Sequence, residues 1–185
     1  MTFSTQQLQA LRTAILADAT ALAAWNIGDD TGVANRMNQI DVTFFLWRSD
    51  ASVQTIFEQI TWANLTPADA PDSTQLWMNR ALACQGKQFS IQTMLTGRST
   101  LDATRSTLRS GLQDALTNVP SGTGGAAVSA GWVGVRDTAL KRNAKLVEKA
   151  LADTSSGNGL IGTPAVPVFQ GNLMPDDIPQ IRMAP

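Results

Sequence analysis

Residues able to carry out acid–base or nucleophilic chemistry are few in this sequence. Histidine and tyrosine are absent, and the single cysteine, Cys84, lies among apolar neighbours. Without histidine the chain lacks the commonest general base, the usual activator of a nucleophile and a principal zinc ligand. We therefore expect Cys84 to be a buried, unreactive thiol. We predict no catalytic residue, no cofactor and no metal site, and hence a protein that is not an enzyme.

Carboxylates are the remaining candidates for catalysis. Asp29-Asp30 and Asp176-Asp177 are adjacent pairs, whose side chains diverge on a helix or strand, so we interpret them as helix caps or a solvated turn. Glu58 and Glu148 stand alone on predicted helix faces. Two carboxylates distant in sequence can still form a glycosidase pair, so a carboxylate-based cell-wall hydrolase remains an alternative.

Basic residues cluster late in the chain, where we predict a helix over residues 126–152. Three of its lysines are spaced four apart and would form a stripe, with an arginine beside them. Three roles remain open: a solvated face, a contact with an acidic neighbouring subunit, or a non-specific contact with passing DNA. The net charge of −1 and the lack of interleaved aromatic residues make the DNA signal weak. The stripe comprises Lys141, Arg142, Lys145 and Lys149.

A glycine-rich segment, residues 121–125, precedes this predicted helix. Such a segment can cradle phosphate, but a phosphate loop has a lysine and a Ser or Thr at the start of its helix. Here Gly125 is followed by Ala126-Ala127-Val128. We therefore predict a flexible or tightly turning hinge between two helices.

The rest of the chain has mainly helical periodicity, and we predict an all-α bundle of about six or seven helices. Ser4 and Gln7 form a capping box at the first helix, and residues 41–48 are ambiguous between strand, connector and helical turn. Interruption is expected at Gln85-Gly86. The predicted helical segments span about residues 4–18, 20–25, 31–39, 53–60, 73–84, 89–95, 100–116 and 126–152, with caps at Asp30 or Thr31, at Ser49 or Ser52, at Asp72 or Ser73, and at Thr100. Of these, residues 20–25 form only a turn or two, and residues 89–95 resume the pattern of residues 73–84.

We predict a helical domain over residues 1–152 and an extended C-terminal arm over residues 153–185. The arm holds five of the eight prolines, yet it contains clustered apolar residues that a disordered tail would lack. Two arrangements are open: the arm packs back on its own domain, or it docks on a neighbour by strand addition or in a groove. The candidate partner-binding residues are Leu160, Ile161, Pro164, Val166, Val168, Phe169, Leu173 and Met174.

The composition bears on what surrounds the protein. Charged residues make up 16% of the chain, against roughly 25% in typical soluble domains. Either part of the surface is covered by a partner, or neutral polar residues replace charges. There is neither a signal-peptide pattern nor an apolar run of about 20 residues. We therefore expect synthesis in the cytoplasm and no membrane partner.

Several stretches together resemble a known class of protein. These are the pattern from Leu8 to Asp18, the residues from Val42 to Arg48, Ile60-x-Trp62, the glycine hinge with Ala126-Ala127, residues 145–152, and Gly162 to Ala165 followed by Phe169-Gln170-Gly171. The chain is similar in these stretches to small all-helical virion proteins of tailed bacteriophages, the head–tail adaptor (connector) proteins.

This resemblance implies a structural role in the virion. Adaptors of this class form a ring below the portal, commonly of about twelve copies, and a C-terminal arm reaches the portal protein. A tail or nozzle protein binds the opposite side, and DNA passes through the channel. The implied location is the virion, after synthesis in the host cytoplasm. A tail-completion or terminator protein is an alternative within the same class.

Overall fold

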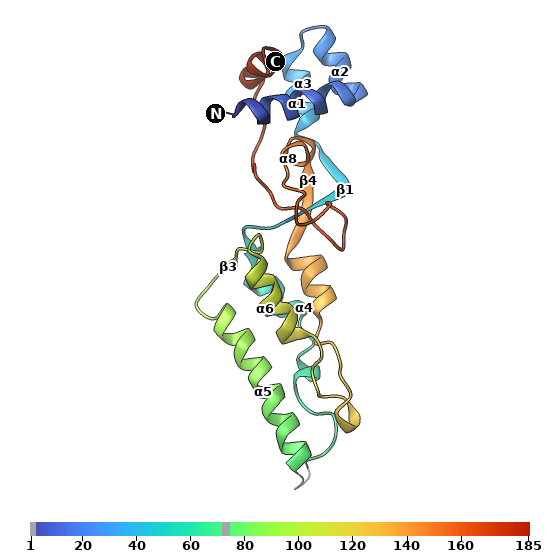
Figure 1. Ribbon diagram of the computed structural model, residues 1–185, viewed down its shortest axis with the longest axis vertical. Helices are drawn as coiled ribbons and strands as arrows, with labels where there is room; N and C mark the ends of the chain where they lie inside the picture. The colour runs from blue at the N-terminus through green and yellow to red at the C-terminus, as the bar shows by residue number, and fades with distance from the viewer. Residues whose placement is uncertain (1–2, 72–74) are drawn as a thin grey trace. The chain divides into compact units, whose positions relative to one another are not determined.

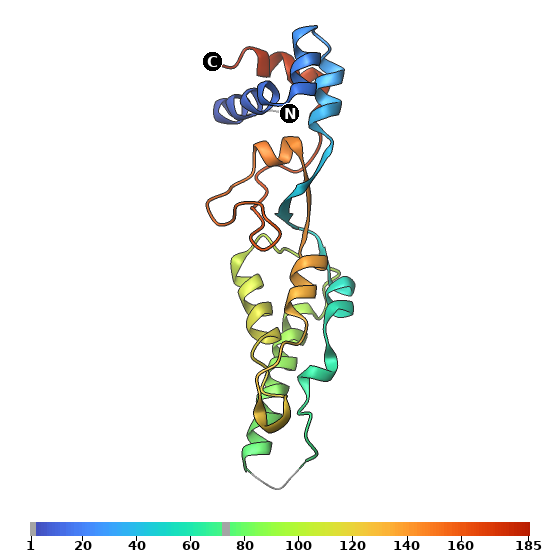
Figure 2. The same ribbon diagram turned by 90° about the vertical axis from the view of Figure 1, so that its right-hand side faces the viewer.

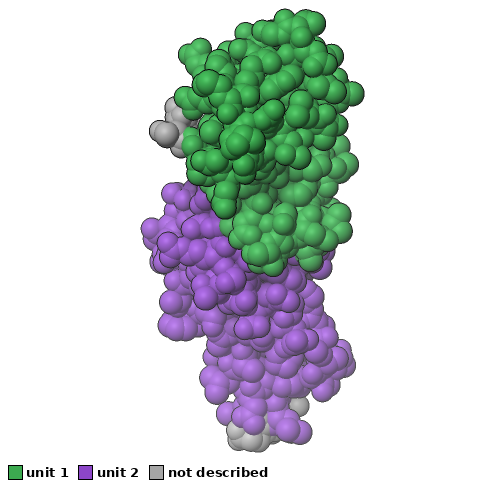
Figure 3. Space-filling view, turned by 45° about the horizontal axis from the view of Figure 1, so that its top comes forward, with its two compact units in different colours: residues 1–47, 142–185 green, residues 48–141 purple. Residues whose placement is uncertain are grey.

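The computed structural model describes residues 3–71 and 75–185, drawn in Figure 1 and Figure 2. The chain divides into two compact units, coloured separately in Figure 3. Unit 1 combines Met1–Trp47 with Arg142–Pro185, and unit 2 is Arg48–Lys141. The boundary at residue 152 that the sequence suggested does not coincide with this division, because the C-terminal segment folds with the N-terminal helices.

Unit 1 begins with three N-terminal helices, and only some of their predicted cap residues are the ones observed. The capping box of Ser4 and Gln7 at α1 is confirmed, and Asp18 caps α2. Asp29, and not Asp30 or Thr31, caps α3 by accepting from the Gly32 N–H. The elements of unit 1 are α1 (Thr5–Ala17), α2 (Ala19–Asn26), α3 (Asp30–Met37), β1 (Ile40–Trp47), β4 (Lys141–Lys145, whose first residue belongs to unit 2), α8 (Leu146–Ala150), the 3-10 turn η4 (Pro175–Asp177) and α9 (Ile178–Arg182).

The ambiguous residues 41–48 fall almost entirely in a strand. β1 pairs with β4 in a two-stranded antiparallel sheet. The β-branched and aromatic composition from Val42 to Trp47 favours this conformation. Its partner strand is about a hundred residues away in sequence, which is why local periodicity could not decide between strand and connector.

Unit 2 contains two helices that lie side by side, α5 and α6 (Figure 1). Ser52 caps α4, as one of the two predicted alternatives. β2 and β3 pair antiparallel, with Ala51 opposite Leu101 and Ser52 opposite Thr100. The elements are β2 (Ala51–Ser52), α4 (Val53–Gln59), the 3-10 turn η1 (Trp62–Leu65), α5 (Gln75–Leu95), β3 (Thr100–Leu101), α6 (Ser106–Leu116), the 3-10 turn η2 (Thr123–Gly125), α7 (Trp132–Gly134) and the π-helical turn η3 (Val135–Ala139).

The all-α prediction is wrong: of the described residues, 53% are helical and 13% are in strands or bridges, so the fold is mixed α/β. Two predicted helix boundaries are also wrong. α5 continues through Gln85-Gly86 without interruption, and Thr100 lies in β3 instead of capping a helix. The predicted caps Asp72 and Ser73 lie outside the described residues.

The predicted basic helix over residues 126–152 is also wrong. That stretch contains α7, η3, β4 and α8 in succession. Gly131 explains part of this break, because its φ of +100° is unfavourable for other residues and a Cβ there would lie 2.3 Å from the Gln59 carbonyl oxygen. Pairing of β4 with β1 then imposes an extended conformation on residues with helical spacing.

The glycine-rich segment is not a free hinge. The Gly124 N–H donates to Asp69 Oδ2 at 3.1 Å, and Arg80 Nη2 donates to the same oxygen at 2.8 Å. The Arg80 hydrogen bond, followed by the one from Gly124, lowers the pKa of Asp69. One side chain therefore fixes η2 to the start of the neighbouring helix α5.

Candidate interaction surfaces

The C-terminal segment is anchored in the core of unit 1 by its second half. Phe169 and Leu173 are buried with residues of α1 and α3, and the rings of Phe3 and Phe169 are 5.5 Å apart. Asn38 fixes the backbone, since its side-chain amide donates to the Leu173 carbonyl and its Oδ1 accepts from the Leu173 N–H, both at 2.8 Å. Of the two arrangements considered for this segment, packing on its own chain is the one observed.

The first half of the segment runs along the edge of β1. The Phe45 N–H donates to the Gly159 carbonyl at 2.7 Å, and the Ala165 N–H donates to the Phe45 carbonyl at 3.0 Å. The Trp47 N–H donates to the Ala165 carbonyl at 3.0 Å. The segment therefore adds to a strand, as one docking mode predicted, but the strand belongs to its own chain.

A short loop between these contacts presents two aliphatic side chains, which we call the arm tip, Leu160 and Ile161. The loop is closed by backbone hydrogen bonds between Gly159 and Thr163 and between Thr163 and Leu160, both 3.0 Å, and by the side chain of Asn158. Leu160 is 57% exposed and Ile161 55% exposed. An ordered loop thus displays apolar surface that solvent does not favour.

The other predicted arm residues divide into two groups. Phe169, Leu173 and Pro164 are buried and Val166 is half-buried, so in this structure their apolar surface serves the fold of unit 1. Val168 and Met174 are exposed, like the arm tip. The exposed members of the predicted set are therefore four: Leu160, Ile161, Val168 and Met174.

The predicted lysine stripe does not exist as one helix face, because β4 and α8 divide its residues. In unit 2, buried Lys141 pairs with Asp137 at 2.8 Å. In unit 1, Lys149 pairs with Asp41 at 2.7 Å, and Lys145 donates to the Asn172 side chain at 2.6 Å. The lysine ammonium groups are thus engaged within the chain, which weakens the interpretation of this segment as a site for DNA or an acidic partner.

The fourth basic residue, Arg142, forms a paired contact with Glu148. Its two terminal nitrogens lie 2.7 and 2.9 Å from the two carboxylate oxygens, and Glu148 also accepts from the Lys145 N–H at 3.0 Å. Only 2% of the Glu148 side chain is exposed. Burial raises the pKa of Glu148, but the Arg142 hydrogen bond and the Lys145 N–H outweigh it, and the net shift is downward. A general acid requires the opposite shift.

The remaining candidates for chemistry are Glu58 and Cys84, and each has a structural explanation. Glu58 accepts a hydrogen bond from Gln54 at 2.9 Å on the surface of α4. Cys84 is buried, as expected, and burial raises the pKa of its thiol, which disfavours the reactive thiolate. The described part of the chain contains no cluster of side chains suited to a metal ion. None of its helices has the length and hydrophobicity required to cross a bilayer.

The surface that the sequence interpretation missed is the outer face of α5. Only two of the 21 residues of this helix are charged, Arg80 and Lys87. Arg80 binds Asp69, and Lys87 Nζ donates to the backbone carbonyls of Asp114 and Thr117 at the end of α6. Four large apolar side chains remain more than half exposed: Leu76, Met78, Leu82 and Phe89. The sequence signal was the near absence of charge across a helix of six turns.

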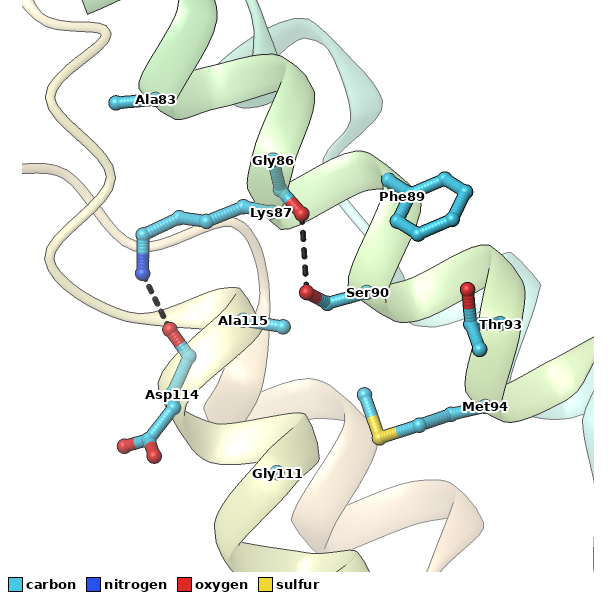
Figure 4. A pocket seen from close by; sticks show the side chains of 10 residues that line it. All are labelled: Ala83, Gly86, Lys87, Phe89, Ser90, Thr93, Met94, Gly111, Asp114 and Ala115. Atoms are coloured by element: carbon cyan, nitrogen blue, oxygen red, sulfur yellow. Dashed lines mark hydrogen bonds between the residues drawn. The ribbon is translucent and has the colours of Figure 1, made fainter.

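A groove of about 620 Å³ runs beside this face, between α5 and α6 (Figure 4). Its walls contain the small residues Ala83, Gly86 and Ser90 of α5 and Gly111 and Ala115 of α6. Lys87 reaches across one end of the groove to the Asp114 carbonyl. Small side chains along two adjacent helices leave room for another element to approach both backbones.

Comparisons of the chain with protein-family models, with curated proteins and with solved structures find no match. The chemistry of the surfaces described above is therefore the basis for a function. Two of them present ordered apolar surface to solvent: the arm tip of unit 1 and the outer face of α5 in unit 2.

Proposed function

We propose that this protein is a structural subunit of a bacteriophage virion, of the head–tail adaptor type. In this role it assembles on the portal protein as a ring, of about twelve copies as in the proteins it resembles. The opposite side of the ring contacts a tail or nozzle protein. DNA passes through the ring without specific recognition, and no membrane is involved.

The observation that carries the proposal is the arm tip. Leu160 and Ile161 are held out by a loop that is hydrogen-bonded both within itself and to β1. Ordering before binding reduces the entropy lost on association, so a small apolar contact contributes more affinity. Repetition of the same weak contact around a ring multiplies its effect. The tip is therefore suited to docking in a groove of the portal protein or of a neighbouring subunit.

Other residues of the segment support this geometry. Phe169 and Leu173 anchor the base of the arm in the core of unit 1, so a force on the tip is transmitted to the body of the subunit. Val168 and Met174 provide further exposed apolar surface. A structural subunit that transmits load between portal and tail needs both an anchored base and an exposed tip.

The alternative, a carboxylate-based hydrolase, is less well supported. Glu148 is ion-paired with Arg142 and its pKa is lowered, whereas the acid of a glycosidase pair needs a raised pKa. Glu58 lies on the surface of α4, hydrogen-bonded to Gln54. Neither residue has the environment of a general acid. A tail-completion or terminator role would use the same kind of apolar docking at another position in the virion.

The test is genetic complementation of particles that lack this protein. We expect the double variant Leu160→Asp, Ile161→Asp to fold but to lower the yield of infectious particles by at least about tenfold, because buried charge opposes docking. Ile27→Asp, at another exposed apolar site of unit 1, is the matched control and should retain the yield. Glu58→Gln should also retain it.

Two results would overturn the proposal. One is a full yield of particles with the folded double variant. The other is a loss of infectivity with Glu58→Gln while particle assembly is intact, which would indicate a hydrolytic step. Circular dichroism of each purified variant separates a docking defect from misfolding.

A further inference from the structure

We propose that the outer face of α5 is a self-association surface on which a second copy of the chain packs its own α5, antiparallel and crossing at Gly86. The interface is isologous, so each copy contributes the same residues. This proposal concerns the isolated protein and does not depend on the adaptor role.

The first observation is the chemistry of the face. A helix exposed to solvent in a soluble protein carries charged or polar residues on its outer side. Here Leu82 and Phe89 are exposed at a spacing of seven residues, with Met78 one turn before them. The two charges of the helix, Arg80 and Lys87, are engaged within unit 2. The other exposed residues of the helix are small or uncharged polar ones, such as Ala83, Ser90 and Thr93, so no free charge opposes packing of another helix on this side.

The second observation is independent and concerns Gly86, near the middle of α5. Glycine is the least favourable helix residue apart from proline. A Cβ placed at Gly86 would meet no atom within 4 Å, so the chain itself does not require glycine there. A glycine is required where a second backbone approaches closely. Gly86 lines the groove of Figure 4, and the space that its Cβ would occupy is open to the backbone of another molecule.

The distribution of side chains about Gly86 favours a second copy over an unrelated partner. Leu82 precedes Gly86 by four residues and Phe89 follows it by three. In an antiparallel pair that crosses at Gly86, Leu82 of each copy therefore lies level with Phe89 of the other copy. The small residues Ala83 and Ser90 are placed in the same way, three before and four after. The face is thus self-complementary, with two apolar contacts flanking a glycine–glycine crossing.

The available area suits a stable dimer. A helix of 21 residues is about 31 Å long. With the neighbouring α6 at a typical interhelical distance, the face is roughly 20 Å wide, which gives about 600 Å² per copy. Specific interfaces bury roughly 600–1,000 Å² per partner, so this face reaches the lower end of the range for a stable dimer. The groove between the two helices provides the concave part of this face.

Native mass spectrometry and sedimentation of the full chain test the proposal. We expect a species of twice the 19.7 kDa chain mass at micromolar concentration. Phe89→Asp and Gly86→Trp should each raise the dimer dissociation constant by at least about tenfold while the fold is retained, since both positions are open to solvent in one copy. Ile27→Asp, in unit 1, is the control and should leave the dimer intact.

Cross-linking tests the crossing point itself. In Gly86→Cys the two thiols lie on either side of the two-fold axis, within the Cβ separation of about 3.5–4.5 Å that a disulfide requires. We expect a covalent dimer on mild oxidation. Gln9→Cys, at an exposed position of α1 in unit 1, is the matched control, because it lies outside the α5 face; it should remain monomeric in gels run without reductant. Native Cys84 is buried and should not cross-link.

Three outcomes would overturn the proposal. The wild-type chain could be monomeric at about 100 µM, or the dimer could persist in both folded variants, Phe89→Asp and Gly86→Trp. Equal cross-linking of Gly86→Cys and Gln9→Cys would show that any dimer lacks the proposed crossing. If the wild type is monomeric but loses binding to the portal protein on Phe89→Asp, the face belongs to a different partner.

Discussion

The basic segment from Arg136 to Lys149 and the outer face of α5 differ in how their side chains are satisfied. The basic segment contains many charges, and its lysines and arginines are bound by carboxylates or carbonyls of the same chain. The face of α5 contains no free charge, and its large apolar side chains have no cover within the chain. In this molecule the charged segment is therefore engaged in contacts within the chain, whereas the helix face without free charge leaves its apolar side chains exposed.

The difference follows from the physical chemistry of the two kinds of group. A buried charge is stable only when it is paired, so Glu148 and Lys141 each require an ion-pair partner within the chain. Exposed apolar surface is tolerated by the fold but favours association. The binding function of such a protein is therefore better sought where charge is missing from a regular helix than where charge accumulates.

The largest expected effect separates the base of the arm from its tip. Phe169→Ala and Leu173→Ala remove buried side chains from the core of unit 1 and should each lower the free energy of unfolding by about 3 kcal/mol. Leu160→Ala, at the exposed tip, should change it by less than about 0.5 kcal/mol. Urea denaturation measures the unfolding free energy of all three variants. Equal effects at the base and at the tip would contradict the distinction between a buried anchor and an exposed tip.

A similar effect is expected for the buried ion pair of the basic segment. Glu148→Ala removes a buried carboxylate and leaves the Arg142 guanidinium, which is 27% exposed, without its ion-pair partner, so it should destabilise unit 1 by about 2–3 kcal/mol. The control is Glu58→Ala, on the exposed surface of α4, with an effect within about 0.5 kcal/mol. Chemical denaturation of both variants provides the comparison. Tolerance of Glu148→Ala would indicate that the pair is not structural.

Acid should destabilise unit 1. The Arg36 hydrogen bond, opposed in part by burial, holds the pKa of Asp18 at about 2, and hydrogen bonds from Lys149 and Thr43 hold the pKa of Asp41 at about 2. Both values lie below the ordinary 3.8, so the stabilisation is complete above about pH 4 and is lost as pH falls towards 2. After allowance for solvent screening, each group contributes about 1 kcal/mol.

The measurement is the unfolding free energy of the wild type and of Asp18→Asn at pH 7 and pH 2.5. The variant should be less stable than the wild type at pH 7, and the difference should shrink at pH 2.5. A constant difference would mean that the Asp18 carboxylate does not contribute through its charge.

The smallest expected effect concerns Gly86 on the outer face of α5. Gly86→Ala should stabilise the monomeric chain by about 0.5–1 kcal/mol, because alanine is the better helix former and the Cβ meets no neighbour. The same methyl group should weaken the proposed dimer. Thermal unfolding at a concentration below the dimer dissociation constant measures the first effect, and a destabilised monomer would show that Gly86 serves the fold of the single chain.

Local signals in the sequence identified part of the fold. The capping box of Ser4 and Gln7 and the cap at Ser52 were predicted because each depends on residues within one turn. The β1–β4 pair and the docking of the arm on β1 were not, because each joins segments about a hundred residues apart. The periodicity of residues 126–152 was real, but strand pairing and Gly131 determine the conformation there.

The candidate sites show the same limit. The exposed tip residues Leu160 and Ile161 belong to the predicted arm set, whereas Phe169 and Leu173 have the same apolar character and are buried. Composition cannot distinguish an anchor from a tip, because that depends on the tertiary partner. The α5 face was visible only as missing charge, and the low charged fraction of the chain agrees with it.

The most direct test of the structural role is the native mass of the protein mixed with the portal protein encoded in the same genome. The wild-type chain and the double variant Leu160→Asp, Ile161→Asp are compared, with Ile27→Asp as the control. We predict that the wild type and the control add to the portal in a fixed multiple of the chain, near twelve as in the proteins it resembles, and that the double variant does not. Failure of the wild-type chain to bind the portal, or binding that is unchanged in the folded double variant, would contradict the account.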